Sequence, residues 1–256
     1  ADAWARPGSA AGGAEPFPPE SILSGLTLEE MSEGSRRAER IHARLVRLHA
    51  PRRLVRAKDV RPMLAEAAEA PFSRPGWIYE LKYDGFRLIA AREGGDGKKP
   101  HLYYRRGNDS TAVFPEVARA LGALPYWSLV LDGEVVVHDE AGRPSFQRLQ
   151  KRAQLSRAID IERASVEMPA TLHVFDLRGF EEFDLRPLPL VERKAILREI
   201  LPRAGPLRFA DHVEGKGKEL YEQVHARRLE GVVAKKADSP YRPGRSADWL
   251  KMRVER

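Results

Sequence analysis

The chain has 256 residues, no cysteine and a formal net charge of +7, with a pI of about 9.7. The absence of cysteine excludes disulfides, zinc–thiolate sites and a cysteine nucleophile, and it favours an intracellular protein. No apolar run approaches the ~20 residues that span a bilayer, and no secretory signal pattern opens the chain. The positive charge points to a polyanionic partner such as a nucleic acid.

The first sixty residues differ in composition from the rest of the chain. Residues 1–20 are rich in Ala, Gly and Pro without periodicity, which predicts a disordered leader. Residues 21–60 predict a basic, partly helical linker, in which Ile41 and Leu45 stand at helical spacing. Between 36 and 61, ten Lys or Arg face two acids, a charge of +8. This run is either a basic arm for a phosphate backbone or a solvated linker, and we favour the linker.

Residues 61–256 mix strand-like and helix-like segments without a regular βαβ alternation, which predicts an α+β domain. Expected strands lie at 77–79, 86–91, 101–104, 129–137, 171–177, 231–235 and 248–253. Expected helices lie at 114–124, 146–155, 189–201 and 218–229. Hairpin-type turns are frequent, so we expect largely antiparallel sheets flanked by helices.

Two Asp-Gly dipeptides are predicted to turn the chain. Asp84-Gly85 joins the first two expected strands, which should then run back against one another as a pair. Lys82 would sit at a strand end, where a rigid backbone can aim its amine. Asp132-Gly133 is expected to interrupt the β-rich run at 129–137.

Six short motifs follow one another between about residue 62 and the end of the chain. They are Lys82-Tyr83-Asp84-Gly85-Phe86-Arg87, Arg105-Arg106-Gly107-Asn108-Asp109, Asp132-Gly133-Glu134, Phe175-Asp176, Glu230-Gly231-Val232-Val233-Ala234-Lys235 and Trp249-Leu250-Lys251-Met252-Arg253. In this order they resemble the nucleotidyltransferase motifs of ATP-dependent DNA ligases, a superfamily that also includes RNA ligases and mRNA capping enzymes. Residues 239–244 and 22–27 are most similar to bacterial end-joining ligases of the ligase D type.

The resemblance implies a fold and a reaction. The fold would be a nucleotidyltransferase (ATP-grasp-like) adenylation domain over residues 61–256, with no OB-fold domain in this chain. Lys82 would attack the α-phosphate of ATP to give lysyl-AMP. AMP would then pass to a DNA 5′-phosphate, from which a neighbouring 3′-hydroxyl displaces it, sealing a nick or break. The cofactors would be ATP and Mg²⁺ (or Mn²⁺).

The chemistry of an amine nucleophile agrees with this interpretation. Lysine attacks phosphorus only when deprotonated, and its ordinary pKa is near ~10.4. Lys235, Lys251, Arg253 and a metal ion around one phosphate would lower the pKa of Lys82. The same positive charges would stabilise the negative charge that builds on the phosphate in the transition state.

The resemblance also assigns the remaining site residues. Contacts to the nucleotide are expected from Glu80, Arg87, Arg105, Glu134, Phe175, Lys235, Lys251 and Arg253. Phe175 would stack on adenine, although an apolar strand could equally bury it in the core. Glu134 and Glu230 are expected to hold the metal, because carboxylates on separate strands suit a hard, oxygen-seeking cation. We expect Arg193 on a solvated helix face, and the seven histidines to be structural.

Two other functions remain open from the sequence. One is an RNA ligase or capping-type nucleotidyltransferase with the same covalent chemistry. The other is an inert DNA-end-binding module supported by the basic run. Expected partners are double-stranded DNA with nicks or ends, and also Ku and polymerase or phosphoesterase domains of a larger polypeptide. We expect a bacterial, cytoplasmic, nucleoid-associated protein that does not bind membranes.

Overall fold

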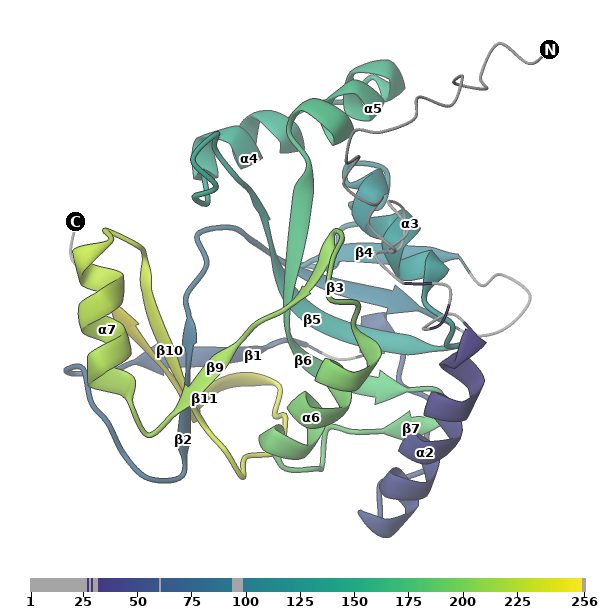
Figure 1. The fold of residues 1–256 in the computed structure, drawn as a ribbon, viewed down its shortest axis with the longest axis vertical. Coiled ribbons are helices and arrows are strands. Elements are labelled where there is room, and N and C mark those ends of the chain that lie inside the picture. The colour runs from purple at the N-terminus through teal and green to yellow at the C-terminus, as the bar shows by residue number, and fades with distance from the viewer. Residues whose placement is uncertain (1–26, 28, 30–31, 60, 94–98, 255–256) are drawn as a thin grey trace, which may run out of the picture.

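The structure is a computed structural model that describes residues 27, 29, 32–59, 61–93 and 99–254 (Figure 1). The leader predicted at residues 1–20 lies outside the described residues. The helices are α2 (Gly34–Arg47), α3 (Pro115–Ala123), α4 (Phe146–Ala153), α5 (Ala158–Glu167), α6 (Leu190–Ile200) and α7 (Gly217–Ala226), with a 3-10 turn η1 at Ala57–Asp59. Within this described part, no helix is long and apolar enough to cross a membrane.

One sheet has five strands in the order β1-β11-β10-β2-β9. Its strands are β1 (Met63–Ala67), β2 (Trp77–Leu81), β9 (His212–Glu214), β10 (Gly231–Lys236) and β11 (Gly244–Arg253). β1 pairs in parallel with β11, and the other neighbours pair antiparallel. Helix α7 lies on this sheet against β10 and β2 (Figure 1).

The second sheet has six strands, with β4-β3-β5-β6-β7 in order and β8 paired in parallel to β6. Its strands are β3 (Phe86–Arg92), β4 (Pro100–Tyr104), β5 (Leu129–Val137), β6 (Ala170–Phe180), β7 (Phe183–Asp184) and β8 (Leu207–Phe209). All other pairings in it are antiparallel. The predicted α+β fold with largely antiparallel sheets flanked by helices is therefore confirmed.

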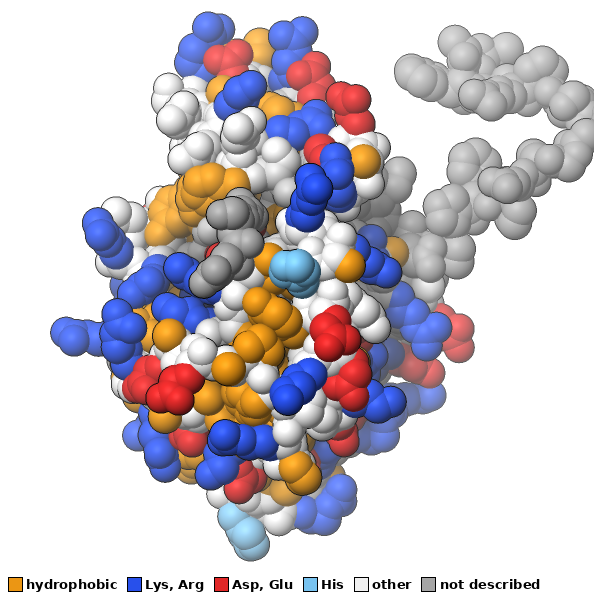
Figure 2. Space-filling view, turned by 90° about the vertical axis from the view of Figure 1, so that its left-hand side faces the viewer, with side chains coloured by type: hydrophobic (Ala, Val, Ile, Leu, Met, Phe, Trp, Pro, Cys, Tyr) orange, Lys and Arg blue, Asp and Glu red, His pale blue; other side chains and the backbone are white. Residues whose placement is uncertain are grey.

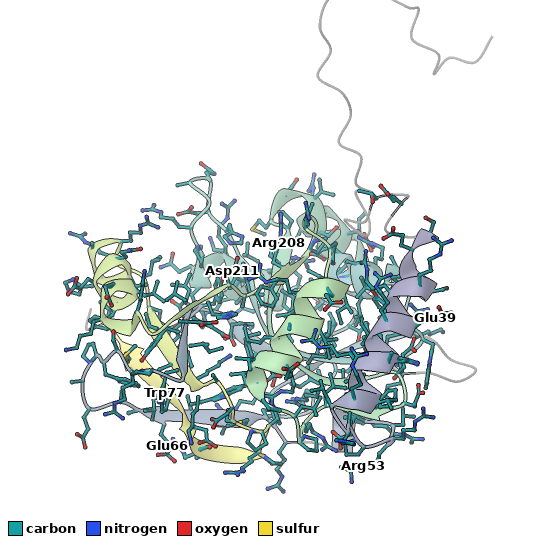
Figure 3. All side chains as sticks on the ribbon, turned by 60° about the horizontal axis from the view of Figure 1, so that its bottom comes forward. Glu39, Arg53, Glu66, Trp77, Arg208 and Asp211 are labelled. Atoms are coloured by element: carbon teal, nitrogen blue, oxygen red, sulfur yellow. The ribbon has the colours of Figure 1, made fainter. Side chains whose placement is uncertain are left out.

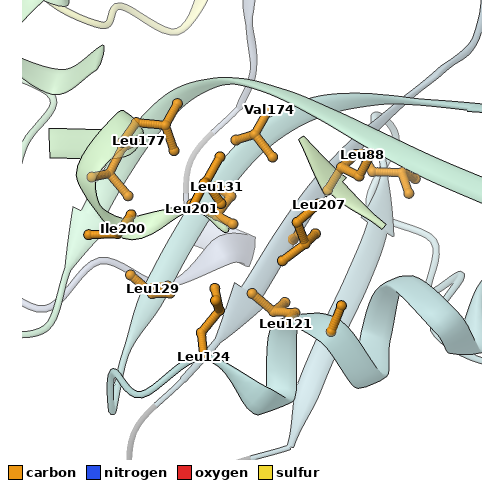
Figure 4. Close-up of a cluster of buried hydrophobic side chains, with 14 of the residues drawn as sticks. Leu88, Leu121, Leu124, Leu129, Leu131, Val174, Leu177, Ile200, Leu201 and Leu207 are labelled. Carbon is orange, nitrogen blue, oxygen red and sulfur yellow. The ribbon is translucent and has the colours of Figure 1, made fainter. Parts of the chain in front are cut away.

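The main core lies between the six-stranded sheet and the helices that cover it. Figure 4 shows Leu131 and Val174 of the sheet facing Leu121 of α3 and Ile200 of α6, and all four side chains are fully buried. Burying a side chain of this size contributes roughly 1.5–3 kcal/mol. Because successive strand residues point to opposite faces, β6 sends Val174 into this core and Phe175 to the other side of the sheet.

Helix α2 packs against this core. Its Ile41 and Leu45, which the sequence places at helical spacing, are buried in the main core. On the flank of the helix, Arg44 bonds to Glu192 at 2.8 Å and Glu199 at 3.0 Å, both on α6. The sequence leaves open whether this segment packs on the domain, and the structure packs α2 on it. The domain boundary at residue 61 stays a prediction.

The expected pairing of the strands on either side of Asp84-Gly85 is wrong. β2 belongs to the five-stranded sheet and β3 to the six-stranded sheet, so the chain crosses between sheets at this point. A Cβ on Gly85 would lie 2.2 Å from the carbonyl oxygen of Val135. The glycine therefore permits close approach to β5, and the strand partners come from distant parts of the chain.

The turn expected at Asp132-Gly133 is also wrong, because β5 is continuous from Leu129 to Val137. The strand instead shifts its register against β6 between Asp132 and Gly133. A Cβ on Gly133 would lie 2.7 Å from the carbonyl oxygen of His173, so the glycine allows β6 to approach.

The helices expected at 114–124, 146–155, 189–201 and 218–229 are confirmed as α3, α4, α6 and α7, with shifts at their ends. Helix α5 and strands β1, β7, β8 and β9 are not among the predicted elements.

Candidate active site

A cavity of about 840 Å³ opens where the two sheets meet. Its lining comes from β1, β2, β10 and β11 of one sheet and from β3, β4, β5 and β6 of the other. The predicted site residues that line it are Glu80, Lys82, Arg87, Arg105, Glu134, Phe175, Lys235, Lys251 and Arg253. Residues far apart in the sequence thus converge on one cavity. Glu230 lies outside the lining and is linked to it by its contact with Lys82.

Lys82 follows the end of β2 at the crossing between the sheets. Its backbone N–H donates to the carbonyl of Gly231 at 2.9 Å, and its ammonium group donates to Glu230. Gly231 has φ of +149°, and a Cβ there would lie 2.3 Å from the carbonyl oxygen of Met252. Only glycine fits this position without strain, so the start of β10 holds the lysine backbone in place.

The two carboxylates expected to hold a metal have oxygen atoms without a hydrogen-bond partner among the described residues. Burial raises the pKa of Glu134 to about 7, although Arg87 and Lys82 oppose the shift. The carboxylate of Glu134 makes no hydrogen bond to the described residues, and one buried oxygen of Glu230, Oε2, has no partner among them. Unpaired carboxylate oxygens close to Lys82 fit a hard divalent cation.

Two aromatic rings meet at one wall of the cavity. Phe175 and Trp249 pack edge to face, with centroids 6.0 Å apart. Lys235 Nζ lies 4.2 Å from the Phe175 centroid and 4.3 Å from that of Trp249, while Arg87 Cζ lies 5.0 Å from Phe175. Cations over ring faces hold the rings in place electrostatically. Trp249 is absent from the predicted contacts, although it stands inside the last motif.

Glu80 is 3% exposed and lies between two buried lysines. Lys235 Nζ is 2.6 Å from one carboxylate oxygen, and Lys194 Nζ is 2.7 Å from the other. Burial alone would raise the pKa of Glu80, but the two lysines outweigh it and hold the pKa below its usual value. Burial lowers the pKa of Lys235 to about 8. Nothing in the sequence pattern of α6 marks Lys194 as facing this site.

The guanidinium group of Arg87 already forms a bidentate ion pair. It donates to the two oxygens of Asp132 at 2.8 and 2.7 Å, a bidentate geometry that fixes its plane. Its predicted contact with phosphate or ribose stays a prediction.

The remaining cations lie near the open side of the cavity. Arg105 and Arg253 are exposed, and Lys251 is half-buried. Partial burial, followed by the charges of Arg253 and Arg245, lowers the pKa of Lys251. Arg106 and Arg245 also line the cavity and are not among the predicted contacts.

The solvated position expected for Arg193 is wrong. Its guanidinium is fully buried and donates to both oxygens of Asp176 at 2.7 and 2.8 Å. A further bond of 2.9 Å reaches the carbonyl of Ser239. The helix α6 faces the β6 strand here, and the charge of Arg193 is matched by the carboxylate of that strand.

Two histidines make notable contacts. His173 stacks on Tyr83, the neighbour of Lys82, with ring centroids 3.9 Å apart. His42 Nε2 lies 2.6 Å from Glu181 and, together with Glu182, forms a group whose ligand-type atoms lie within 4.8 Å. This group ties α2 to the turn between β6 and β7, and the structural role expected for the histidines stays a prediction.

The family model for the ATP-dependent DNA ligase domain matches residues 62–253. The chain belongs to this ligase family. The resemblance drawn from the six motifs is therefore confirmed, and the nucleotidyltransferase fold is that of the ligase domain.

Curated relatives of this ligase domain include LigD proteins. The multifunctional non-homologous end joining protein LigD of Pseudomonas aeruginosa is 38% identical over 199 residues, which cover 77% of this chain and 22% of the relative. LigD of Mycolicibacterium smegmatis is 36% identical over 201 residues, covering 78% of this chain and 24% of the relative. The ligase domain thus spans less than a quarter of these relatives.

Solved structures agree with the sequence relatives. The mycobacterial DNA ligase D complexed with ATP and MES superimposes with a TM-score of 0.64 at 28% identity. The superposition covers 78% of this chain and 62% of that structure. The predicted similarity to ligase D enzymes is confirmed at the level of the domain.

Proposed function

We propose that this ligase domain charges itself with AMP at Lys82. The Nζ–P bond forms at the α-phosphate of ATP and the bond to the departing pyrophosphate breaks. The ammonium group gives up two protons to solvent, and one hydrogen stays on the phosphoramidate nitrogen. The observation that carries the proposal is that Lys82 opens into a cavity lined by eight further residues expected to contact the nucleotide.

The site residues divide the work between binding and charge. Phe175 and Trp249 offer an apolar wall for the base, and Lys235 and Lys251 supply positive charge for phosphate oxygens. Glu230 orients the Lys82 side chain through their contact. Cations grouped around one phosphate stabilise the transition state of phosphoryl transfer, in which little covalent chemistry is left to the protein.

Glu134 and Glu230 would hold Mg²⁺ or Mn²⁺, because their unpaired oxygens match the preference of hard cations. When bound, the metal would neutralise charge on the phosphate oxygens.

Transfer of AMP to a 5′-phosphate and sealing of nicks or ends in double-stranded DNA complete the proposal. The net charge of +7 supports a polyanionic substrate. On the face drawn in Figure 2, Lys and Arg side chains, interspersed with Asp and Glu, surround a central apolar band. Arg36, Arg40 and Arg47 of α2 make no ion pair with any described residue.

The LigD relatives are named as multifunctional end-joining proteins. This supports Ku, and polymerase or phosphoesterase domains of a larger polypeptide, as partners of the ligase domain. A bacterial cytoplasmic protein associated with the nucleoid would fit these partners.

The test is retention of label from ATP carrying a radioactive α-phosphate, with Mg²⁺ present and GTP in parallel. We expect the denatured wild-type chain to retain label from ATP and not from GTP, and the Lys82→Ala variant to retain none. Lys236→Ala is the matched control, because Lys236 is exposed and lies outside the cavity. Label that persists in Lys82→Ala, or a wild-type chain that is never labelled, would contradict the proposal.

A further inference from the structure

A single buried hydroxyl group connects the two walls of the cavity. Tyr241 lies in the segment between β10 and β11 and is 4% exposed. Its hydroxyl accepts from the backbone N–H of Met63 at 2.8 Å and donates to Asp132 Oδ2 at 2.6 Å. Arg178 donates to the same hydroxyl and, at 3.0 Å, to the same carboxylate oxygen.

The charge states of these groups are fixed by their surroundings. Burial, followed by the charge of Asp132, raises the pKa of Tyr241. Burial would raise the pKa of Asp132, but Arg87 and Arg178 outweigh it and hold the pKa well below its usual range. Tyr241 is therefore a neutral donor to a charged carboxylate, and such charge-assisted bonds are the stronger kind.

Each partner of the hydroxyl leads to a different wall. Met63 belongs to β1, and the next two residues, Leu64 and Ala65, line the cavity. Asp132 belongs to β5 and accepts two hydrogen bonds from Arg87, which lines the opposite side of the cavity. β1 is in the five-stranded sheet and β5 in the six-stranded sheet, so one oxygen atom joins them.

The segment that carries Tyr241 is itself held firmly. The Tyr241 N–H donates to the carbonyl of Arg186 at 2.8 Å, and its ring packs edge to face on Trp249 at 6.0 Å. Two residues earlier, the carbonyl of Ser239 accepts from Arg193 at 2.9 Å. The hydroxyl is thus a fixed point to which both walls are bonded.

We propose that Tyr241 is a positioning residue that sets the spacing of the two walls of the nucleotide cavity, through Met63 on one side and the Asp132–Arg87 pair on the other. The inference rests on the proposed function, in which ATP occupies this cavity. Loss of the hydroxyl leaves the Met63 N–H without its acceptor and frees the walls to separate.

The test compares Tyr241→Phe with Tyr79→Phe. Tyr79 is also fully buried, and its hydroxyl also accepts from a backbone N–H, that of Arg74 at 2.8 Å, but it has no link to a cavity carboxylate. We expect both variants to unfold at lower temperature than the wild type. Only Tyr241→Phe should raise the half-saturating ATP concentration for self-adenylylation, by roughly tenfold. Its labelling rate at saturating ATP should fall less.

A second readout is the rise in unfolding temperature that ATP produces. It should shrink in Tyr241→Phe and match the wild type in Tyr79→Phe. Equal half-saturating ATP in all three proteins would overturn the inference and leave the proposed function standing. A wild-type chain that neither takes up label nor is stabilised by ATP would instead overturn the proposed function.

Discussion

Asp132 and Glu134 stand two residues apart on β5, yet their carboxyl groups behave in opposite ways. Asp132 is fully buried and accepts from Arg87, Arg178 and Tyr241, which hold its pKa well below the usual range. The carboxylate of Glu134 makes no hydrogen bond to any described residue, and burial raises its pKa to about 7. One strand therefore carries a satisfied carboxylate and an unsatisfied one.

The comparison separates charges that hold the fold from charges kept for a ligand. A buried carboxylate with several donors is part of the scaffold, and its loss leaves uncompensated cations behind. A buried carboxylate without donors weakens the fold and is retained where a ligand will complete it. The same contrast occurs on α2, where Arg44 pairs with Glu192 and Glu199 while Arg40 has no ion-pair partner in the described chain.

The largest expected effect is on the Asp132 side of the comparison. Asp132→Asn keeps the shape but removes the carboxylate charge that faces the buried guanidinium groups of Arg87 and Arg178. We expect the free energy of unfolding to fall by about 3–5 kcal/mol. Urea unfolding at pH 8 measures it, with Glu134→Gln as the control that should lose nothing. An equal decrease in the free energy of unfolding in both variants would contradict the different roles assigned to Asp132 and Glu134.

Glu134→Gln should instead affect the reaction. The variant removes a carboxylate proposed to hold the metal, so we expect self-adenylylation with Mg²⁺ to slow by at least about tenfold, equivalent to ~1.4 kcal/mol of transition-state stabilisation. Its free energy of unfolding at pH 8 should be unchanged or higher, because folding no longer removes the ionised Glu134 carboxylate from water. A variant that is labelled as fast as the wild type would remove Glu134 from the site.

The two carboxyl groups should also leave opposite marks on the pH dependence of stability. Between ~4.3, the usual pKa of Glu, and about 7, the folded state holds a proton on Glu134 that the unfolded state has lost. This group therefore makes stability fall as pH rises through that window, and Glu134→Gln should abolish the fall.

The contribution of Asp132 to stability changes with pH in the opposite direction. Its folded pKa lies below the unfolded value of ~3.9, so its contribution is present above that pH and is lost as pH decreases below it. Urea unfolding at a series of pH values from 3 to 8 measures the contributions of both carboxyl groups to the free energy of unfolding. The same slope in wild type and Glu134→Gln between pH 4.3 and 7 would contradict the assignment.

The smallest effects are expected on α2. Arg44→Ala should lower the free energy of unfolding by less than about 1 kcal/mol and leave DNA binding intact. Arg40→Ala should leave stability unchanged and reduce by ~0.9 the slope of log affinity against log salt concentration, if Arg40 meets a phosphate. Filter binding of nicked DNA over a salt series distinguishes the two arginines. Identical slopes for both variants would count against α2 as a DNA contact.

The sequence predicts the composition of the cavity well, because short local motifs carry the reactive residue types. Lys82, Phe175 and Lys235 are each found from their immediate neighbours in the chain. The arrangement beneath the cavity could not be found in that way. Arg193 depends on Asp176, 17 positions away, and Tyr241 depends on Asp132, 109 positions away.

The prediction of which strands pair is wrong for the same reason. An Asp-Gly dipeptide favours a turn wherever it occurs, but tertiary packing decides whether the two strands become neighbours. Gly85 and Gly133 allow another strand to approach closely, because a Cβ at either position would collide with it. The sequence around each glycine does not show which strand that is.

The parallel pairing of β1 with β11 has a consequence for the order in which a newly made chain assembles. All strands of the six-stranded sheet have been synthesised once β8 has left the ribosome, whereas β1 must wait for the last strand of the domain before it finds its neighbour. Contacts between distant segments form late because the intervening loop must close first. The nucleotide cavity lies between a sheet that is complete early and one that is complete late. The cavity in which we propose that Lys82 is charged is therefore complete only after β11 has been synthesised.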